Sequence, residues 1–150
     1  MSLRIPPVLQ FLACTALGWA LAALLDGLTL SLPGTTPLGW AMIVIGGMLL
    51  IVSVSAFISA RTTVNPLAPA KAEKLVTTGL YRLSRNPMYL ALAIVLVGEA
   101  VLLANLAAFA APAIFVVAIT TFQILPEERA LRENFGNEYL TYCHKTRRWI

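Results

Sequence analysis

The sequence predicts an all-α integral membrane protein with four transmembrane helices and with its polar segments gathered on one side of the membrane. Of its 150 residues, 59% are hydrophobic and only 12% are charged, whereas about a quarter of the residues of a soluble domain are charged. Its apolar runs reach the length of about 20 residues that a helix needs to cross a bilayer. Its lysines and arginines fall in segments that these helices would place on one side.

The spans follow in order along the chain. The first covers residues 8–25 and the second residues 38–60, and the turn-rich segment "DGLTLSLPGTTP" separates them. Residues 88–125 are apolar again, and this run is too long for one crossing at about 1.5 Å per residue. Asn105 lies near its middle. We therefore expect a helical hairpin with spans at 88–104 and 106–125, within a single domain of residues 1–150.

The basic residues indicate how the helices are oriented. They occur in residues 61–87, in residues 126–150 and at Arg4, while the two loops on the other side contain neither Lys nor Arg. Because loops rich in Lys and Arg stay on the cytoplasmic side, both termini and the central loop are predicted to be cytoplasmic. The net charge of +4 thus reflects membrane topology, and we expect no nucleic-acid partner. With only Arg4 before it, the first span is interpreted as retained, not as a cleaved signal peptide.

Two cysteines and one histidine give no indication of a metal or disulfide site. Cys14 lies in an apolar run, and Cys143 and His144 lie in the basic C-terminal segment. These residues lack the spacing of a zinc site or of a disulfide framework. We predict no bound metal.

Small residues recur at helical spacing in the first two spans. Cys14, Gly18 and Ala22 form one stripe, and Gly46 and Gly47 lie in the second span. Small residues let helices approach closely in lipid, so these positions are interpreted as packing surfaces.

A polar motif, "TTGLYRLSRNPMY", precedes the third span at residues 77–89. Asn86 followed by Pro87 is typical of a helix start, with a side-chain acceptor at the N-cap and a fixed φ at the first helical position. Such a start exposes backbone N–H groups that suit an anion, and Arg85 adds a planar donor suited to a carboxylate or phosphate. The alternative is an interfacial anchor, in which Arg85 and Tyr89 only contact headgroups.

A second polar motif follows the hairpin and therefore returns to the same membrane surface. Pro126 is predicted to begin a short helix with Glu127 and Glu128 in its first turn, where acidic side chains favour the helix dipole. Glu128 and Arg132 also form an i, i+4 pair, so capping alone is one explanation for the carboxylates. Beyond this helix, the amphipathic segment that contains Tyr139 and Tyr142 is expected to close over the site.

The two motifs together suit a ligand of mixed chemistry. Carboxylates suit an ammonium group, a helix start suits a carboxylate, and aromatic faces suit a cation or a base. S-adenosylmethionine combines all of these groups with a sulfonium. The sequence contains no G-x-G-x-x-G after a strand, which excludes a Rossmann methyltransferase.

At these residues the chain resembles the superfamily of isoprenylcysteine carboxyl methyltransferases and phospholipid N-methyltransferases, in its bacterial branch. The matching segments are "LVTTGLYRLSRNPMYL", "EERALRENFGNEYLTY" and "TTVNP" at 62–66. The resemblance implies that the cytosolic loop and the C-terminal helices form a pocket for S-adenosylmethionine. The contacts it implies are Leu75, Val76, Tyr81, Asn86, Pro87, Met88, Tyr89 and Glu127, with Glu128 beside them.

Two positions depart from the pattern of the eukaryotic prenylcysteine enzymes. Those enzymes usually have His where this chain has Asn86, and they have an Arg suited to the substrate carboxylate where this chain has Gln123. Asn86 retains a hydrogen-bonding side chain, whereas Gln123 puts prenylcysteine as the substrate in doubt.

The expected reaction is transfer of a methyl group to a lipidic or isoprenoid-linked acceptor at the cytosolic face, in a bacterial inner membrane. Arg85 and Glu128 are the predicted catalytic residues, with Glu128 as the general base that an amine acceptor would require. The identity of the acceptor, its methylated atom (O, N or S) and the oligomeric state stay open.

Two other functions fit parts of the sequence. Glu99 lies within a span, where a carboxyl is costly and often functional, so a small proton-coupled transporter is one alternative. A membrane reductase that uses NADPH is another, because sterol reductases share the C-terminal architecture.

Overall fold

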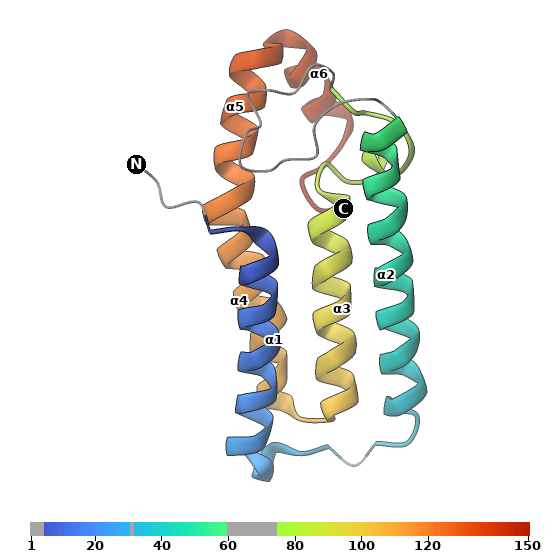
Figure 1. Cartoon of the computed structure of the whole chain (residues 1–150), viewed down its shortest axis with the longest axis vertical. Coiled ribbons are helices and arrows are strands. Elements are labelled where there is room, and N and C mark those ends of the chain that lie inside the picture. Colours follow the sequence, from blue (N-terminus) through green and yellow to red (C-terminus); the bar gives the residue numbers. More distant parts are fainter. Residues whose placement is uncertain (1–4, 31, 60–74) are drawn as a thin grey trace.

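The computed structural model describes residues 5–30, 32–59 and 75–150, and helices make up most of this part of the chain (Figure 1). The predicted stretch "TTVNP" and the basic residues Arg4, Arg61, Lys71 and Lys74 lie outside it. The α-helices are α1 (Pro7–Leu24), α2 (Thr35–Ser59), α3 (Pro87–Leu103), α4 (Ala110–Ile119), α5 (Leu125–Phe135) and α6 (Asn137–Lys145). Short 3-10 turns cover Asp26–Leu28, Gly79–Arg82 and Leu106–Phe109.

The structure confirms an all-α membrane protein. Three helical stretches are long and apolar enough to cross a membrane, namely Pro7–Leu24, Thr35–Ala56 and the continuous stretch Leu106–Phe135. The fourth, α3, is apolar and has 17 residues, which is at the lower limit for a crossing. Helices α1, α2 and α3 begin and end within three residues of the bounds predicted for the first three spans.

The four long helices lie side by side, and the polar segments gather at one end of them. In Figure 1, α5, α6 and the described segment before α3 lie together at the upper end, and the connections from α1 to α2 and from α3 to α4 lie at the lower end. Every described Lys and Arg belongs to the segments at the upper end, namely Arg82, Arg85, Arg129, Arg132, Lys145, Arg147 and Arg148. The structure therefore has the charge asymmetry on which the predicted orientation rests.

Glycines bring α2 and α3 into backbone contact. A Cβ added at Gly46 would lie 2.8 Å from the carbonyl oxygen of Ala91, and one added at Gly98 would lie 2.9 Å from that of Gly39. At Gly47 an added Cβ would meet nothing within 4 Å, so only the first glycine of the predicted Gly46–Gly47 pair packs against α3. Adjacent residues of a helix point to different faces. Gly47 therefore does not share the contact that Gly46 makes with α3.

Helix α5 begins at Leu125, with Glu127 and Glu128 in its first turn as predicted, but it is not a separate helix, because one continuous helical stretch runs from Leu106 to Phe135. A π-helical turn at Thr120–Ile124 lies just before this proline, and the N–H of Leu125 donates to the carbonyl of Thr120. Proline lacks an N–H and its ring clashes with the preceding turn of an ordinary α-helix. The wider π turn accommodates Pro126, so Glu127 and Glu128 lie inside a helix and not at a free N-terminus.

At the opposite end, Asn105 fastens the hairpin to α1. The backbone of Ala104 is left-handed, with φ 45°, and reverses the chain after α3. The side chain of Asn105 then accepts from the N–H of Ala107 at 2.8 Å and donates to the carbonyl of Leu25 at 2.8 Å. Asn105 is almost fully buried, and the hairpin predicted around it is present.

Candidate functional site

The two sequence motifs meet through Tyr89 and Glu127. The hydroxyl of Tyr89, in the first turn of α3, donates to Oε1 of Glu127 at 2.8 Å. The side-chain amide of Gln123 donates to the same oxygen at 2.6 Å. Because Gln123 belongs to the π turn and is 1% exposed, this carboxylate is held where the membrane helix passes into α5.

Glu128 forms a second charged centre together with two arginines. Arg85 donates from Nη2 to its Oε1 at 3.0 Å. Arg148, in the C-terminal segment, donates from Nε to Oε1 at 3.0 Å and from Nη2 to Oε2 at 2.8 Å. The side chains of Arg85 and Glu128 are 14% and 16% exposed, and that of Arg148 is 37% exposed. The predicted catalytic pair, Arg85 and Glu128, is therefore in direct contact.

Asn86 lies at the N-cap of α3 as predicted, but its side chain does not cap the helix. Its side-chain amide donates to the carbonyl of Arg148 at 3.0 Å. Its backbone N–H instead donates to the hydroxyl of Ser84 at 3.1 Å. The N-cap prediction failed in this detail because it considered only neighbours in sequence. The C-terminal segment brings a carbonyl to which the side-chain amide of Asn86 donates.

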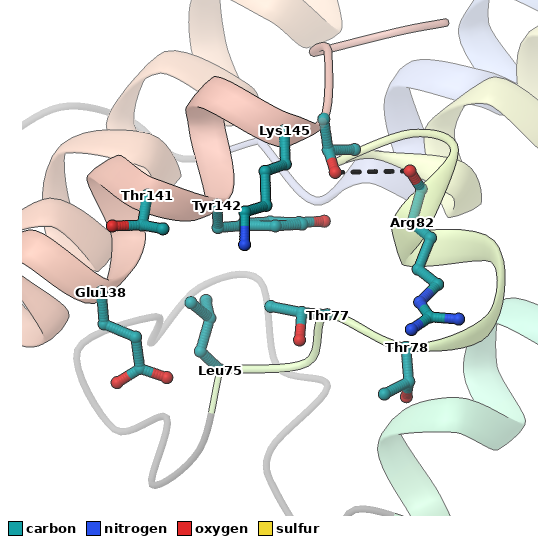
Figure 2. Close-up of a pocket in the computed structure, with 9 residues that line it drawn as sticks. Leu75, Thr77, Thr78, Arg82, Glu138, Thr141, Tyr142 and Lys145 are labelled. Atoms are coloured by element: carbon teal, nitrogen blue, oxygen red, sulfur yellow. Dashed lines mark hydrogen bonds between the residues drawn. The ribbon is translucent and has the colours of Figure 1, made fainter.

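A cavity of about 570 Å³ lies between the segment before α3 and helix α6; of the predicted contact residues Leu75 lines it, whereas Asn86, Tyr89 and Glu127 do not. Figure 2 shows Leu75 and Thr77 on one side of it and Tyr142 and Lys145 on the other. The remaining lining residues are Thr78, Arg82, Glu138, Thr141 and Thr146. The cavity thus combines an aromatic and an aliphatic side chain with hydroxyl and charged groups.

Tyr142 joins the cavity to the rest of the site. Its hydroxyl donates to the carbonyl of Tyr81 at 2.6 Å, and its ring packs edge-on against that of Tyr139. The segment after α5 thus folds back onto the first motif, and its closure over the site stays a prediction. Of the other predicted contact residues, Val76 and Pro87 are buried and Met88 is half-buried.

Three buried tyrosines outside the spans, called the site tyrosines below (Tyr81, Tyr139 and Tyr142), are held as neutral phenols. Burial is the main cause that raises the pKa of each of them above its ordinary value. The nearby Tyr142 and Glu127 raise the pKa of Tyr81 further, and Glu128 does the same for Tyr139. Neutral phenols can donate hydrogen bonds throughout the physiological pH range.

Glu99 is remote from these groups. It lies ten residues after Tyr89 in α3, which is about 15 Å along the helix axis, and it accepts from the hydroxyl of Thr15 at 3.4 Å. Across residues 5–30, 32–59 and 75–150, no three His, Cys, Asp or Glu side chains come together as a potential metal site.

The comparisons with known proteins found a matching family and similar proteins. The sequence profile of the phospholipid methyltransferase family matches residues 35–138. Protein-S-isoprenylcysteine O-methyltransferase B of Arabidopsis thaliana is 33% identical over 110 residues, which are 71% of this chain and 54% of that protein. An uncharacterized protein of Haemophilus influenzae is 41% identical over 63 residues, 42% of this chain and the whole of that protein.

No solved structure matches this chain. The chain spans about half the length of the Arabidopsis relative. The family match includes the first motif, α2 to α5 and the second motif as far as residue 138, and so confirms the superfamily that the motifs indicated. The chain belongs to the phospholipid methyltransferase family.

Proposed function

We propose that this protein transfers a methyl group from S-adenosylmethionine to a lipid-linked acceptor at the membrane face where its basic residues gather. The observation that carries this proposal is the contact between Tyr89 and Glu127, which joins the two motifs; a 570 Å³ cavity lies between the segment before α3 and helix α6. Membership of a membrane methyltransferase family supports the reaction class. The uneven distribution of Lys and Arg supports a cytoplasmic location for this face, in a bacterial inner membrane.

The chemistry of the donor set fits this cofactor. S-adenosylmethionine supplies an electrophilic methyl group on a sulfonium. Glu127, held by Tyr89 and Gln123, offers a fixed carboxylate to an ammonium group. Leu75 and Tyr142 offer the cavity an aliphatic and an aromatic wall, which suit a purine ring. The protein's main task is then to hold the acceptor in line with the methyl group and to exclude water.

Arg85 is the residue best placed to hold the acceptor. Its Nη2 is bound to Glu128, but its Nε is buried and has no hydrogen-bond partner among the described residues. A buried N–H without a partner is unfavourable, and an anionic group on the acceptor would satisfy it. Arg85 thus fits a carboxylate or phosphate on the lipid-linked substrate.

Glu128 is better suited to holding Arg85 than to acting as a base. Both of its oxygens accept hydrogen bonds from guanidinium groups, so each is already engaged in a charge-assisted contact. A nucleophile that arrives without a proton, such as a carboxylate, needs no base. The geometry therefore favours an anionic acceptor over an amine.

Calorimetry on the purified protein in detergent tests the proposal. We expect S-adenosylmethionine to bind and NADPH not to bind, and we expect Glu127→Gln to weaken binding about tenfold or more, as loss of a charged hydrogen bond would. Glu133→Gln is the matched control, because Glu133 lies exposed on the same helix. Binding of NADPH in place of S-adenosylmethionine would support the reductase, and binding of neither would refute the proposed function.

The acceptor is found by mass spectrometry. Membranes with and without the protein receive S-adenosylmethionine that carries a labelled methyl group, and total lipid is then compared. We expect labelled lipid only where the protein is present, and less of it with Arg85→Ala. Equal labelling in both membranes would contradict the proposal.

A further inference from the structure

The C-terminal segment Thr146–Ile150, called the tail below, is built into the site by its backbone. The hydroxyl of Thr146 donates to the carbonyl of Arg82 at 3.3 Å. The N–H of Arg85 donates to the carbonyl of Arg147 at 3.0 Å. The carbonyl of Arg148 accepts from Asn86 and, at 3.3 Å, from the hydroxyl of Ser84. The tail thus runs along the polar segment that leads into α3.

An apolar anchor follows directly. Trp149 is partly buried and packs against the core cluster to which Tyr89 and Ile124 belong, whereas Ile150 is exposed. Hydrogen bonds therefore hold the backbone at Arg147 and Arg148, and packing holds the side chain of Trp149, which follows them. The backbone of Arg148 is thus fixed, and its guanidinium meets Glu128.

From these contacts we infer that Arg148 is a positioning residue for methyl transfer, and this inference rests on the proposed function. The family match ends at residue 138, so the tail lies beyond the part of the chain that the family profile covers. Arg148 binds both oxygens of Glu128, and Glu128 in turn binds Arg85. Because two hydrogen bonds from Arg148 fix the carboxylate of Glu128, Glu128 can in turn hold Arg85 in a single orientation.

The consequence concerns Arg85, the residue proposed to hold the acceptor. Without Arg148, the carboxylate of Glu128 can rotate and carry Nη2 of Arg85 with it. The contact between Tyr89 and Glu127 does not involve Arg148. Loss of Arg148 should therefore slow methyl transfer while binding of S-adenosylmethionine changes little.

Three variants separate this role from a purely structural one. Arg148→Ala removes the guanidinium, Arg148→Lys keeps the charge but not the two-pronged contact, and Arg147→Ala is the matched control, because Arg147 is the exposed neighbour. Initial rates are measured with labelled S-adenosylmethionine at saturation. The acceptor probes are N-acetyl-S-farnesylcysteine and vesicles of phosphatidylethanolamine. Calorimetry gives the Kd for S-adenosylmethionine.

We expect Arg148→Ala to lower the maximal rate about tenfold or more, since small displacements of reacting groups have large effects. The Kd should stay within about threefold of the wild-type value, Arg148→Lys should be intermediate in rate, and Arg147→Ala should match the wild type. A rate for Arg148→Ala equal to that of Arg147→Ala would overturn the inference. So would a faster rate, which would show that the tail obstructs the site.

A stability measurement keeps the inference testable if the wild type transfers no methyl group to either probe. The thermal unfolding of Arg148→Ala, Glu128→Gln and the double variant forms a cycle. If Arg148 holds Glu128, the two losses are not additive. Additive losses would refute the contact on which the inference rests, whereas a wild type that binds no S-adenosylmethionine, with non-additive losses, would refute only the proposed function.

Discussion

The close contact between α2 and α3 predicts opposite effects for the same substitution at two adjacent glycines. In Gly46→Ala, the new Cβ would lie 2.7 Å from Cγ2 of Val95, 2.8 Å from the carbonyl oxygen of Ala91 and 3.2 Å from the backbone nitrogen of Val95. Two of these atoms belong to the backbone, so a side-chain rotation cannot relieve the contact. In Gly47→Ala, the new Cβ has no neighbour within 4 Å.

The magnitude follows from the difference between the two variants. Each replaces a helical glycine by alanine, which favours the helix by about 1 kcal/mol, and this gain cancels in the comparison. What remains is the overpacking at Gly46, about 1–3 kcal/mol. We expect Gly46→Ala to be less stable than Gly47→Ala by this amount, and Gly47→Ala to be at least as stable as the wild type.

Thermal unfolding of both variants in one detergent measures the difference. For a chain of about this size, 1 kcal/mol shifts the Tm by about 2–4 °C, so the two variants should differ by about 2–12 °C. Equal Tm values, or a higher Tm for Gly46→Ala, would show that the helices are not in backbone contact at this glycine.

Four further predictions concern the site and the opposite end of the molecule. Glu128→Gln should lower the free energy of unfolding by about 2–3 kcal/mol, measured by denaturant titration. This value is below the 3–5 kcal/mol for a fully buried pair, because Arg148 is more than a third exposed and that contact is screened. Asn105→Ala should destabilise the protein by about 1–3 kcal/mol in the same titration, since it removes the side-chain partner of the Leu25 carbonyl and of the Ala107 N–H; an unchanged stability would show that Asn105 does not fasten the hairpin. The raised pKa of each site tyrosine means that the unfolded chain loses these protons first as the pH rises above about 10, so stability should be complete below that pH and fall above it. Tyrosinate absorbance at 295 nm should then appear together with unfolding, and absorbance that rises while the fold is intact would disprove the burial. Glu99→Gln should leave binding of S-adenosylmethionine unchanged, whereas proton-driven uptake that this variant abolishes would revive the transporter.

The helices were predictable because lipid imposes a simple rule. A spanning helix must satisfy its own backbone hydrogen bonds and present apolar side chains, so hydropathy alone located the first three spans to within three residues. The meeting of the two motifs was predictable for the same reason, because a hairpin of two spans returns the chain to the same surface. The contact between Tyr89 and Glu127 is the result.

What sequence reasoning missed depends on contacts between distant residues. The tail was interpreted only as basic charge, and nothing in the pattern of Arg147, Arg148 and Trp149 indicates that the chain turns back onto Asn86. Similarly, Pro126 suggested a separate helix because proline disfavours a helix interior, and a π turn leaves no clear local signature. Both misses concern how segments of the chain join or pack together.

The π turn at Thr120–Ile124 lets a proline lie within the continuous helix that leads into the site. A π turn holds one residue more than the α-helical turn it replaces, and Pro126 lies two residues after it. Because the wider turn takes up the extra residue locally, deleting one residue within it would restore α-helical spacing while Glu127 and Glu128 keep nearly the same direction. Pro126 would then lie in the interior of an ordinary α-helix, where its ring clashes with the preceding turn and kinks or breaks the helix at a cost of about 3 kcal/mol. A single-residue deletion in this membrane helix should therefore disturb the site through a kink at Pro126, although every residue of the site would still be present.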